Sequence, residues 1–166
     1  MMALISAWIV LLLDQASKVW VRRQFALGES VTVIPNFLDF TYARNTGAAW
    51  SMLSGHNGVL SMVALCLLVL MFVFRRRIFS DTWEHRLAAG LMTGGVIGNL
   101  IDRIKLGYVT DFIDCYAGTW HWPTFNVADA SICIAVGIYM VSSLWLRDHP
   151  MRESAEKDIS SPTTHV

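Results

Sequence analysis

The chain has 166 residues, of which 54% are hydrophobic and only 16% are charged. Soluble domains carry about 25% charged residues, so this composition indicates a protein that is solvated by lipid. The formal net charge of zero lacks the basic excess that nucleic-acid binding requires, and we expect no nucleic-acid partner.

Four apolar runs predict four transmembrane helices. In chain order they cover about residues 3–21, 59–74, 87–101 and 127–146. Each is close to, or slightly below, the roughly 20 residues that a helix needs to cross the hydrocarbon core. Because the first run lacks the basic start and the cleavage site of a secretory signal, we expect it to be retained. Residues 1–149 are then predicted to form a single integral membrane domain.

The positive-inside rule predicts the orientation of these helices. Three arginines at 75–77 follow the second run and further basic residues follow the fourth, so we expect both termini in the cytoplasm. Segments 22–57 and 102–123 then face outward, although Arg22, Arg23 and Arg44 weaken this assignment. The polar tail at 150–166 is predicted to be a disordered cytoplasmic end.

The first outward segment contains apolar and aromatic residues in a pattern typical of strands. They lie between Val31 and Tyr42 and are interrupted by Pro35 and Asn36. We therefore predict an all-α polytopic membrane protein with four transmembrane helices. A small extracytoplasmic cradle, strand-containing or amphipathic, is expected between the first two.

Two ionisable residues interrupt the first span. Asp14 and Lys18 are four residues apart and therefore share a helix face, where they can form an ion pair. Ionisable side chains are costly in lipid, so each needs a partner or a function. A structural ion pair is one interpretation; contact with substrate headgroups or support of a site is the other.

The third span ends in a cluster of glycines and polar residues. Three glycines between residues 94 and 98 permit close packing of helices. Asn99 and Asp102 lie three apart on one face. With the adjacent Arg103 they are candidates to hydrogen-bond and orient a neighbouring group.

Further acids lie near the start of the fourth span. Asp111 and Asp114 precede it, and Asp129 lies in its first turn, where Asn126 is suited to cap the helix and the helix dipole stabilises an acid. Two carboxylates within hydrogen-bonding reach share a proton, so that one activates water while the other polarises a carbonyl group. From the residues alone, Asp102, Asp111, Asp114 and Asp129 all remain eligible.

Such a pair hydrolyses an amide bond without a metal, a cofactor or a covalent nucleophile, and we expect none of these. The chain lacks the HExxH and GxSxG motifs, and its five histidines are scattered through loops and tail. Cys66, Cys115 and Cys133 have no metal-ligand spacing and are interpreted as small apolar residues.

Five sequence blocks resemble those of the bacterial lipoprotein signal peptidases, the signal peptidase II family. They are DQASK at 14–18, RNTGAAWS at 44–51, GNLIDR at 98–103, VTDFID at 109–114 and FNVAD at 125–129. The blocks have the order and spacing of the family and extend over essentially residues 5–146.

The resemblance implies an intramembrane aspartyl endopeptidase. Its substrate would be a prolipoprotein whose cysteine carries a diacylglyceryl group, cut on the amino side of that cysteine. Asp111 and Asp129 match the family's catalytic pair. Asn45, Asn99, Asp102, Arg103 and Asn126 match polar residues around the pair, and Asp14 and Lys18 match the polar block of the first span.

The same resemblance implies a location and partners. The protein would be a monomer in the bacterial inner membrane, with its site near the outer, periplasmic face. Lipid-modified prolipoproteins and membrane lipid are the expected partners, and the cyclic peptide globomycin is the expected inhibitor. Residues 115–122 depart from the family pattern, which puts the rim of the site in doubt but not its chemistry.

Two other classes of function would also explain acids in a membrane protein. A proton-coupled membrane transporter or assembly subunit carries acids within its spans, but along a path and not at one face. A non-enzymatic adaptor would use the outward segment as a binding surface, with the acids as structural pairs. Release of a signal peptide is expected of the peptidase alone.

Overall fold

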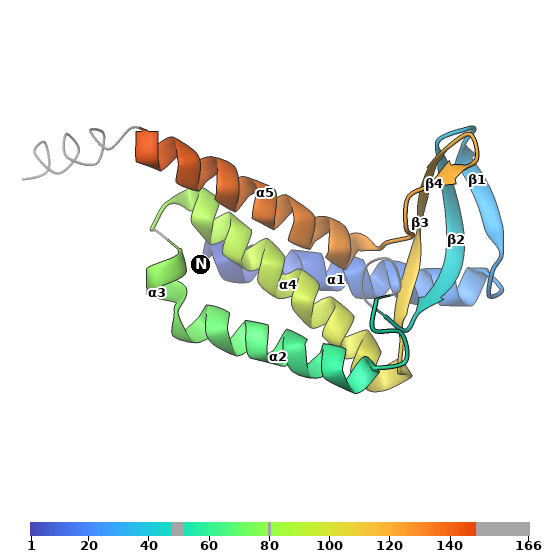
Figure 1. Ribbon diagram of the computed structural model, residues 1–166, viewed down its shortest axis with the longest axis horizontal. Coiled ribbons are helices and arrows are strands. Elements are labelled where there is room, and N and C mark those ends of the chain that lie inside the picture. The colour runs from blue at the N-terminus through green and yellow to red at the C-terminus, as the bar shows by residue number, and fades with distance from the viewer. Residues whose placement is uncertain (48–51, 80, 149–166) are drawn as a thin grey trace, which may run out of the picture.

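The computed structural model describes residues 1–47, 52–79 and 81–148. Its elements in chain order are α1 (Met2–Gln24), β1 (Ser30–Ile34), β2 (Leu38–Asn45), α2 (Asn57–Val73), α3 (Arg75–Ile78), α4 (Trp83–Leu106), β3 (Val109–Ala117), β4 (Trp120–His121) and α5 (Val127–Asp148). The long helices lie side by side, and the sheet stands at one end of them (Figure 1). The tail predicted to be disordered and residues 48–51 of the second sequence block lie outside the described residues.

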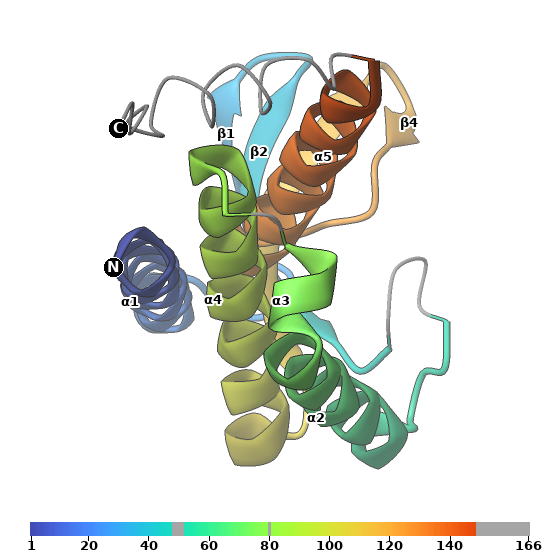
Figure 2. The ribbon, with the colours of Figure 1, turned by 90° about the vertical axis from the view of Figure 1, so that its left-hand side faces the viewer.

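Helix α4 is the centre of the helical part and packs against α1, α2 and α5 (Figure 2). Its glycines let the neighbouring helices approach closely, as predicted. A Cβ atom placed on Gly94 would lie 2.6 Å from the carbonyl oxygen of Ala7 in α1. One placed on Gly95 would lie 2.5 Å from Ser131 Oγ in α5. Two adjacent positions of α4 therefore allow close contact with two different helices.

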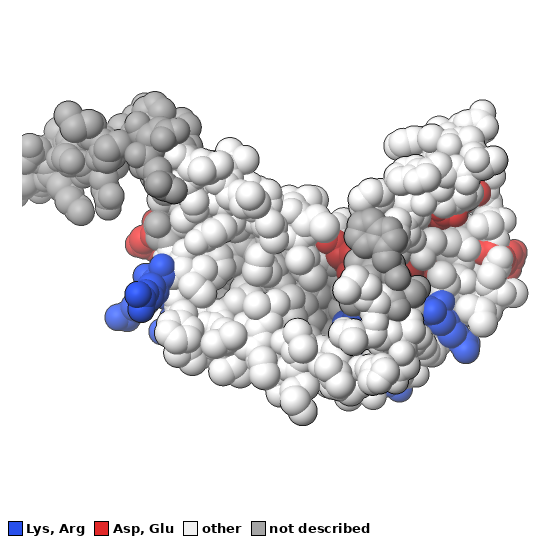
Figure 3. Space-filling view, viewed as in Figure 1, with Lys and Arg blue, Asp and Glu red and all other residues white. Residues whose placement is uncertain are grey.

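The helices carry many of their large apolar side chains on the outside. Leu12 and Leu13 in α1, Met62 and Phe72 in α2, and Val141 in α5 are all exposed. The buried residues include charged and amide side chains from α1 and α4. In Figure 3 a broad uncoloured band separates the charged ends of the molecule. Apolar groups outside and paired polar groups inside are the arrangement that suits a helix bundle solvated by lipid.

Among the described helices, two are long and apolar enough to cross a bilayer. They are Met2–Gln24 and Val127–Leu144, with mean hydropathies of 1.5 and 1.8. Helix α2 is apolar but shorter, at 17 residues. Helix α4 has 24 residues and extends beyond the predicted 87–101, because Thr82 caps its start and Gly107, with a φ of 80°, ends it. Length and hydropathy therefore support two of the four predicted spans.

The strands form one antiparallel sheet in which β1, β2, β3 and β4 are neighbours in chain order. Strands β1 and β2 confirm the prediction for residues Val31 to Tyr42, and the turn between them places Asn36 at a φ of 62°. An apolar cluster of Val21 from α1, Tyr42 from β2 and Phe112 from β3 joins the sheet to the helices.

The sheet is larger than the predicted cradle. Strands β3 and β4 come from the second outward segment, residues 102–123, for which we made no prediction of strands. Strand β3 pairs with β2, with Arg44 opposite Thr110 and Ala43 opposite Asp111. Acids and a hydroxyl occupy several positions of β3, so apolar alternation does not reveal it as a strand.

The two ends of the helical part differ in what they carry. The N-terminus, the short helix α3 with its arginines at 75–77 and the last turns of α5 lie together at one end (Figure 1). The sheet and the first turn of α5, with Asp111 and Asp129, lie at the other. The acids singled out by the sequence therefore lie at the end opposite the N-terminus.

We predict that Gly95→Ala lowers the stability of the protein. The new methyl group would lie 2.5 Å from Ser131 Oγ and 2.6 Å from the carbonyl oxygen of Ala128. Overpacking of this kind costs about 1–3 kcal/mol. Gly137→Ala in α5 is the matched control, because nothing lies within 4 Å of its Cβ position. Thermal unfolding in detergent should give a lower midpoint for Gly95→Ala only, and equal midpoints would contradict this packing.

Candidate active site

Asp111 lies on β3 and is almost fully buried, with 1% of the residue exposed. Asn45, on the neighbouring strand β2, donates from Nδ2 to Asp111 Oδ2 at 2.9 Å. Asn126 donates from Nδ2 to Asp111 Oδ1 at 2.7 Å. Each carboxylate oxygen thus accepts one hydrogen bond from an amide and has the capacity for a second.

Asp129 lies in the first turn of α5, as predicted. Asn126 Oδ1 accepts from the backbone N–H of Asp129 at 3.0 Å, and Asp129 Oδ2 accepts from the backbone N–H of Asn126 at 3.3 Å. This reciprocal pair of bonds is a capping box, so the predicted cap is confirmed. Asn99 of α4 donates from Nδ2 to Asp129 Oδ1 at 2.7 Å. The cap and Asn99 together fix the direction of the carboxylate.

Asn126 joins the two acids, because its side-chain amide contacts Asp111 while its backbone N–H contacts Asp129. Burial and, second, the negative charge of Asp129 raise the pKa of Asp111 from 3.8 to about 7. The hydrogen bonds from Asn45 and Asn126 oppose this rise in pKa but do not offset it. Near neutral pH, Asp111 therefore exists in both protonation states.

The other two eligible acids are engaged elsewhere. Asp102 Oδ2 accepts from the backbone N–H of Thr110 at 3.0 Å and lies 3.7 Å from Lys18 Nζ. Asp114 lies further along β3, where both of its oxygens are 3.0 Å from His121 Nδ1. Asp111 and Asp129 are the two acids that one asparagine joins.

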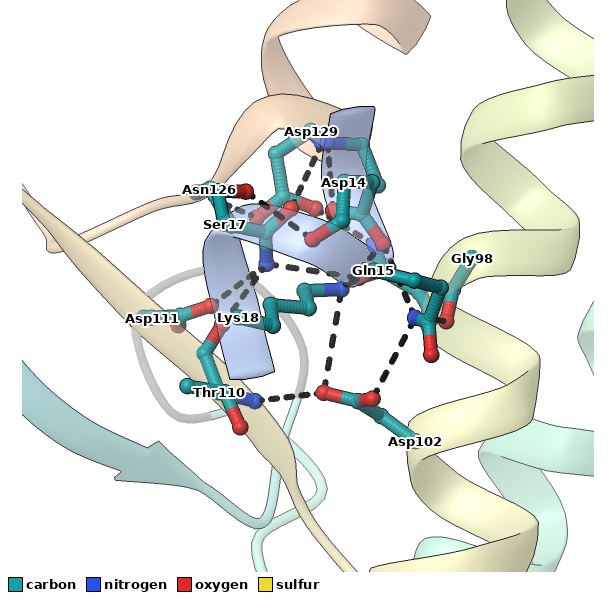
Figure 4. Close-up of polar contacts among 12 residues, drawn as sticks. Asp14, Gln15, Ser17, Lys18, Gly98, Asp102, Thr110, Asp111, Asn126 and Asp129 are labelled. Carbon is teal, nitrogen blue, oxygen red and sulfur yellow. Dashed lines mark hydrogen bonds and ion pairs between the residues drawn. The ribbon is translucent and has the colours of Figure 1, made fainter. Parts of the chain in front are cut away.

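A buried cation, Lys18 of α1, lies next to the pair (Figure 4). Its Nζ is 2.9 Å from Asp14 Oδ2, and it donates to Asn99 Oδ1 at 2.9 Å. The predicted ion pair between Asp14 and Lys18 is therefore confirmed. Both residues are 0% exposed, so neither reaches the surface, where headgroups lie. This burial favours support of the site over contact with headgroups.

Lys18 is connected to Asp129 through two routes. Because an ammonium group only donates, Asn99 must turn its oxygen to Lys18, which leaves its Nδ2 to donate to Asp129. Asp14, the ion-pair partner, accepts from the backbone N–H of Ala128 at 3.0 Å with Oδ1. The same cation therefore sets both the orientation of an amide and the position of the first turn of α5.

Sequence reasoning missed three supporting residues. Gln15 donates from Nε2 to the carbonyl oxygen of Gly98 at 3.1 Å and to Asp102 Oδ1 at 3.4 Å, which ties α1 to α4. Arg22 donates to Thr110 Oγ1 at 2.8 Å, which ties the end of α1 to β3. Gln15 and Thr110 lie inside two of the five sequence blocks, and this position could have marked them as site residues. Arg22 lies outside the blocks.

A cavity of about 440 Å³ opens beside Asp129, and Asn45, Asn99 and Arg103 contribute further polar groups to its lining. Arg103 donates to the carbonyl oxygen of Gly47 at 3.3 Å, while its buried Nε has no hydrogen-bond partner within the described part of the chain. Its apolar lining includes Val109, Trp122, Pro123, Phe125, Ile132 and Cys133. In Figure 3 acidic atoms lie in a hollow between the helices and the sheet.

This arrangement has the parts that general acid–base hydrolysis needs. Asp111 holds a proton over part of the neutral range, and Asp129 presents a carboxylate at the wall of a cavity. A protonated acid polarises a carbonyl group, and a carboxylate accepts a proton from water. The neighbouring amides and Lys18 hold the acids in place.

Comparison with known proteins gives consistent similarities. Residues 6–145 match the family model described as signal peptidase (SPase) II. The lipoprotein signal peptidase of Shewanella pealeana is 45% identical over 143 residues, which are 82% of this chain and 84% of that protein. The lipoprotein signal peptidase of Serratia proteamaculans is 41% identical over 137 residues, 80% of each chain.

Two solved bacterial membrane enzymes have similar structures. One superposes with a TM-score of 0.78 at 30% sequence identity and covers 99% of this chain and 93% of its own. The other has a TM-score of 0.74 at 33% identity and covers 86% of this chain and 92% of its own. The similarity therefore extends over nearly the whole chain, helices and sheet together.

We predict that Lys18→Met lowers the free energy of unfolding by about 3–5 kcal/mol, because it leaves a buried carboxylate without its cation. The double variant Asp14→Asn/Lys18→Met should recover part of this loss. Lys105→Met, on the exposed last turn of α4, is the matched control. Thermal unfolding in detergent measures the stability of the three variants. If Lys18→Met were as stable as Lys105→Met, the buried ion pair would not support the fold.

Proposed function

The chain belongs to the signal peptidase II family, and on that premise we propose that it is an aspartic endopeptidase of the bacterial inner membrane. Its substrate is a prolipoprotein whose cysteine carries a diacylglyceryl group, and it cuts on the amino side of that cysteine. The observation that supports this most is the pair Asp111 and Asp129, joined by Asn126 beside a cavity.

The two acids have different roles. Asp111 is the more buried, and its pKa of about 7 makes it the acid that holds the proton. Asp129 lines the cavity at the start of α5, where the helix dipole and two N–H donors stabilise a carboxylate. We therefore assign Asp129 as the base and Asp111 as the acid.

Hydrolysis proceeds by attack of water on the scissile carbonyl carbon. Asp129 takes a proton from the water while Asp111 hydrogen-bonds the carbonyl oxygen and stabilises the charge that develops on it. When the tetrahedral intermediate collapses, Asp129 returns its proton to the leaving amine nitrogen. Asp111 keeps its proton at the end, and both acids are back in their starting states.

The remaining site residues orient the acids or the substrate. Asn45, Asn99 and Asn126 hold the carboxylates by the hydrogen bonds described above, and Asp14, Lys18 and Asp102 hold α1, α4 and α5 together around them. Arg103, which lines the cavity, binds a carbonyl group of the entering peptide.

We further propose that α2 and α4 complete a four-span topology with both termini in the cytoplasm. The arginines at 75–77 lie at the end of the bundle that holds the N-terminus, as the positive-inside rule requires. The sheet and the acids then lie at the periplasmic face. The protein acts as a monomer, and globomycin inhibits it by occupying the cavity. The acids gather at one end of the helices, which does not suit a proton-coupled transporter.

Replacing either acid by its amide should abolish cleavage. Asp111→Asn and Asp129→Asn should each lower kcat by about a thousandfold or more, because general acid–base groups contribute on that order. Asp114→Asn is the matched control on the same strand, and its activity should stay near that of the wild type. The assay follows release of the signal peptide from a diacylglyceryl-modified preprotein by the purified chain in detergent. Activity in Asp111→Asn with none in Asp114→Asn would assign the acid to Asp114 instead.

The alkaline limb of the pH profile should report Asp111. Its pKa of about 7 means that kcat/KM falls as the pH rises through this value, because the proton on Asp111 is lost. Asn45→Ala removes a hydrogen bond that stabilises the ionised form, so it should raise the pKa of Asp111 and shift the limb to higher pH. An unshifted or acid-shifted limb in Asn45→Ala would argue that another group is the acid.

A further inference from the structure

The cavity beside Asp129 has apolar lining residues that the hydrolysis of an amide bond does not require. Trp122, Phe125, Ile132 and Cys133 are among them. Asp129 and the side-chain amides of Asn45 and Asn99 belong to the same lining. A cavity lined by both polar and apolar groups suits a ligand that is itself polar at one end and apolar at the other.

The apolar lining of the cavity continues along α5. Ile132 and Cys133 are three and four residues beyond Asp129 and so lie on its face of the helix. Val136 and Met140 follow seven and eleven residues beyond Asp129, which returns to the same face, and they are 40% and 56% exposed. These uncharged side chains form a stripe along α5, and the helix itself runs away from the sheet (Figure 1).

The segment after β4 supplies another part of the cavity lining. Trp122 directly follows β4 and is partly exposed, and the more exposed Trp120 lies with its ring 6.0 Å away at 64°. On the same hairpin, His121 stacks on Tyr116 at 5.0 Å and contacts Asp114. Indole rings favour the boundary between membrane and water. The segment after β4 therefore gives the cavity an indole ring of the kind that favours this boundary.

The proposed substrate has a group of matching chemistry, and the next step rests on the proposed function. The lipidated cysteine directly follows the scissile bond, so its side chain must leave the site within a few ångströms of Asp129. A diacylglyceryl thioether is neutral: its ester groups are polar, and its acyl chains are apolar. The stripe on α5 carries no charge that such a group would have to desolvate.

We propose that Trp122, Ile132 and Cys133 bind the diacylglyceryl group of the substrate and that its acyl chains lie along α5 over Val136 and Met140. Trp122 packs on the glycerol end, at the height of the headgroups, and Cys133 leaves room for the first methylene groups. These residues determine specificity for the lipidated substrate and take no part in the hydrolysis itself.

The test compares two variants in this path with one outside it. Trp122→Ala removes one wall, and Cys133→Phe fills the start of the stripe. Ile134→Phe is the matched control, because Ile134 is 56% exposed on α5 and, five residues beyond Asp129, lies off the stripe. The substrates are one preprotein that carries either long-chain or short-chain diacylglyceryl groups. KM and kcat are measured for each combination with the full chain in detergent.

Trp122→Ala and Cys133→Phe should each raise KM for the long-chain substrate by about tenfold, because they remove or displace the burial of apolar groups. Their kcat should stay within about twofold of the wild type, because these residues take no part in the hydrolysis itself. For the short-chain substrate the increase in KM should be much smaller. Ile134→Phe should match the wild type with both.

Three results would overturn the proposal. Wild-type KM in both variants would mean that the group binds elsewhere. An equal increase in KM for both chain lengths would mean that the stripe holds the peptide. A fall in kcat alone, with a lower unfolding temperature, would mean that the residues are structural. Asp129→Asn serves as the separate check: if it cleaves the substrate, the proposed function fails, whereas if it is inactive these three results concern the lipid path alone.

Discussion

A lysine ammonium fully enclosed among helices that expose apolar side chains to lipid is the constraint on which the site depends. Lys18 has no access to solvent, so its hydrogen-bonding and charge partners must come from the protein. Asp14 on its own helix and Asn99 on α4 supply them. This requires α1 and α4 to approach closely, and Gly98 permits it, because a Cβ there would lie 2.5 Å from Asp14 Oδ2.

The arrangement of the acids follows from that contact. Asn99 is turned by Lys18 so that its N–H donates to Asp129, and Asp14 holds the backbone at Ala128. Strand β3 then brings Asp111 to the same place through Asn126, so that a strand, a helix start and a buried ion pair meet at one end of the bundle. Burial of Asp111 among these groups raises its pKa to about 7.

Local features of the site could be predicted from the sequence, and non-local ones could not. The pairing of Asp14 with Lys18 and the capping by Asn126 depend on spacings of four and three residues, which the sequence displays directly. The contact of Asp102 with the backbone of Thr110 depends on a strand that hydrophobic alternation does not reveal. For the same reason physical reasoning alone left four acids eligible, and only the family resemblance reduced them to two.

The central claim is that Asp111 and Asp129 share one proton near neutral pH, with Asp111 as its holder. Infrared difference spectroscopy across a pH titration of the full chain tests this directly, because a protonated carboxyl group has a carbonyl band that an ionised one lacks. The account predicts such a band with a midpoint near the pKa of about 7, absent in Asp111→Asn and present in Asp114→Asn. A band that persists in Asp111→Asn, or no band that titrates in this range, would contradict it.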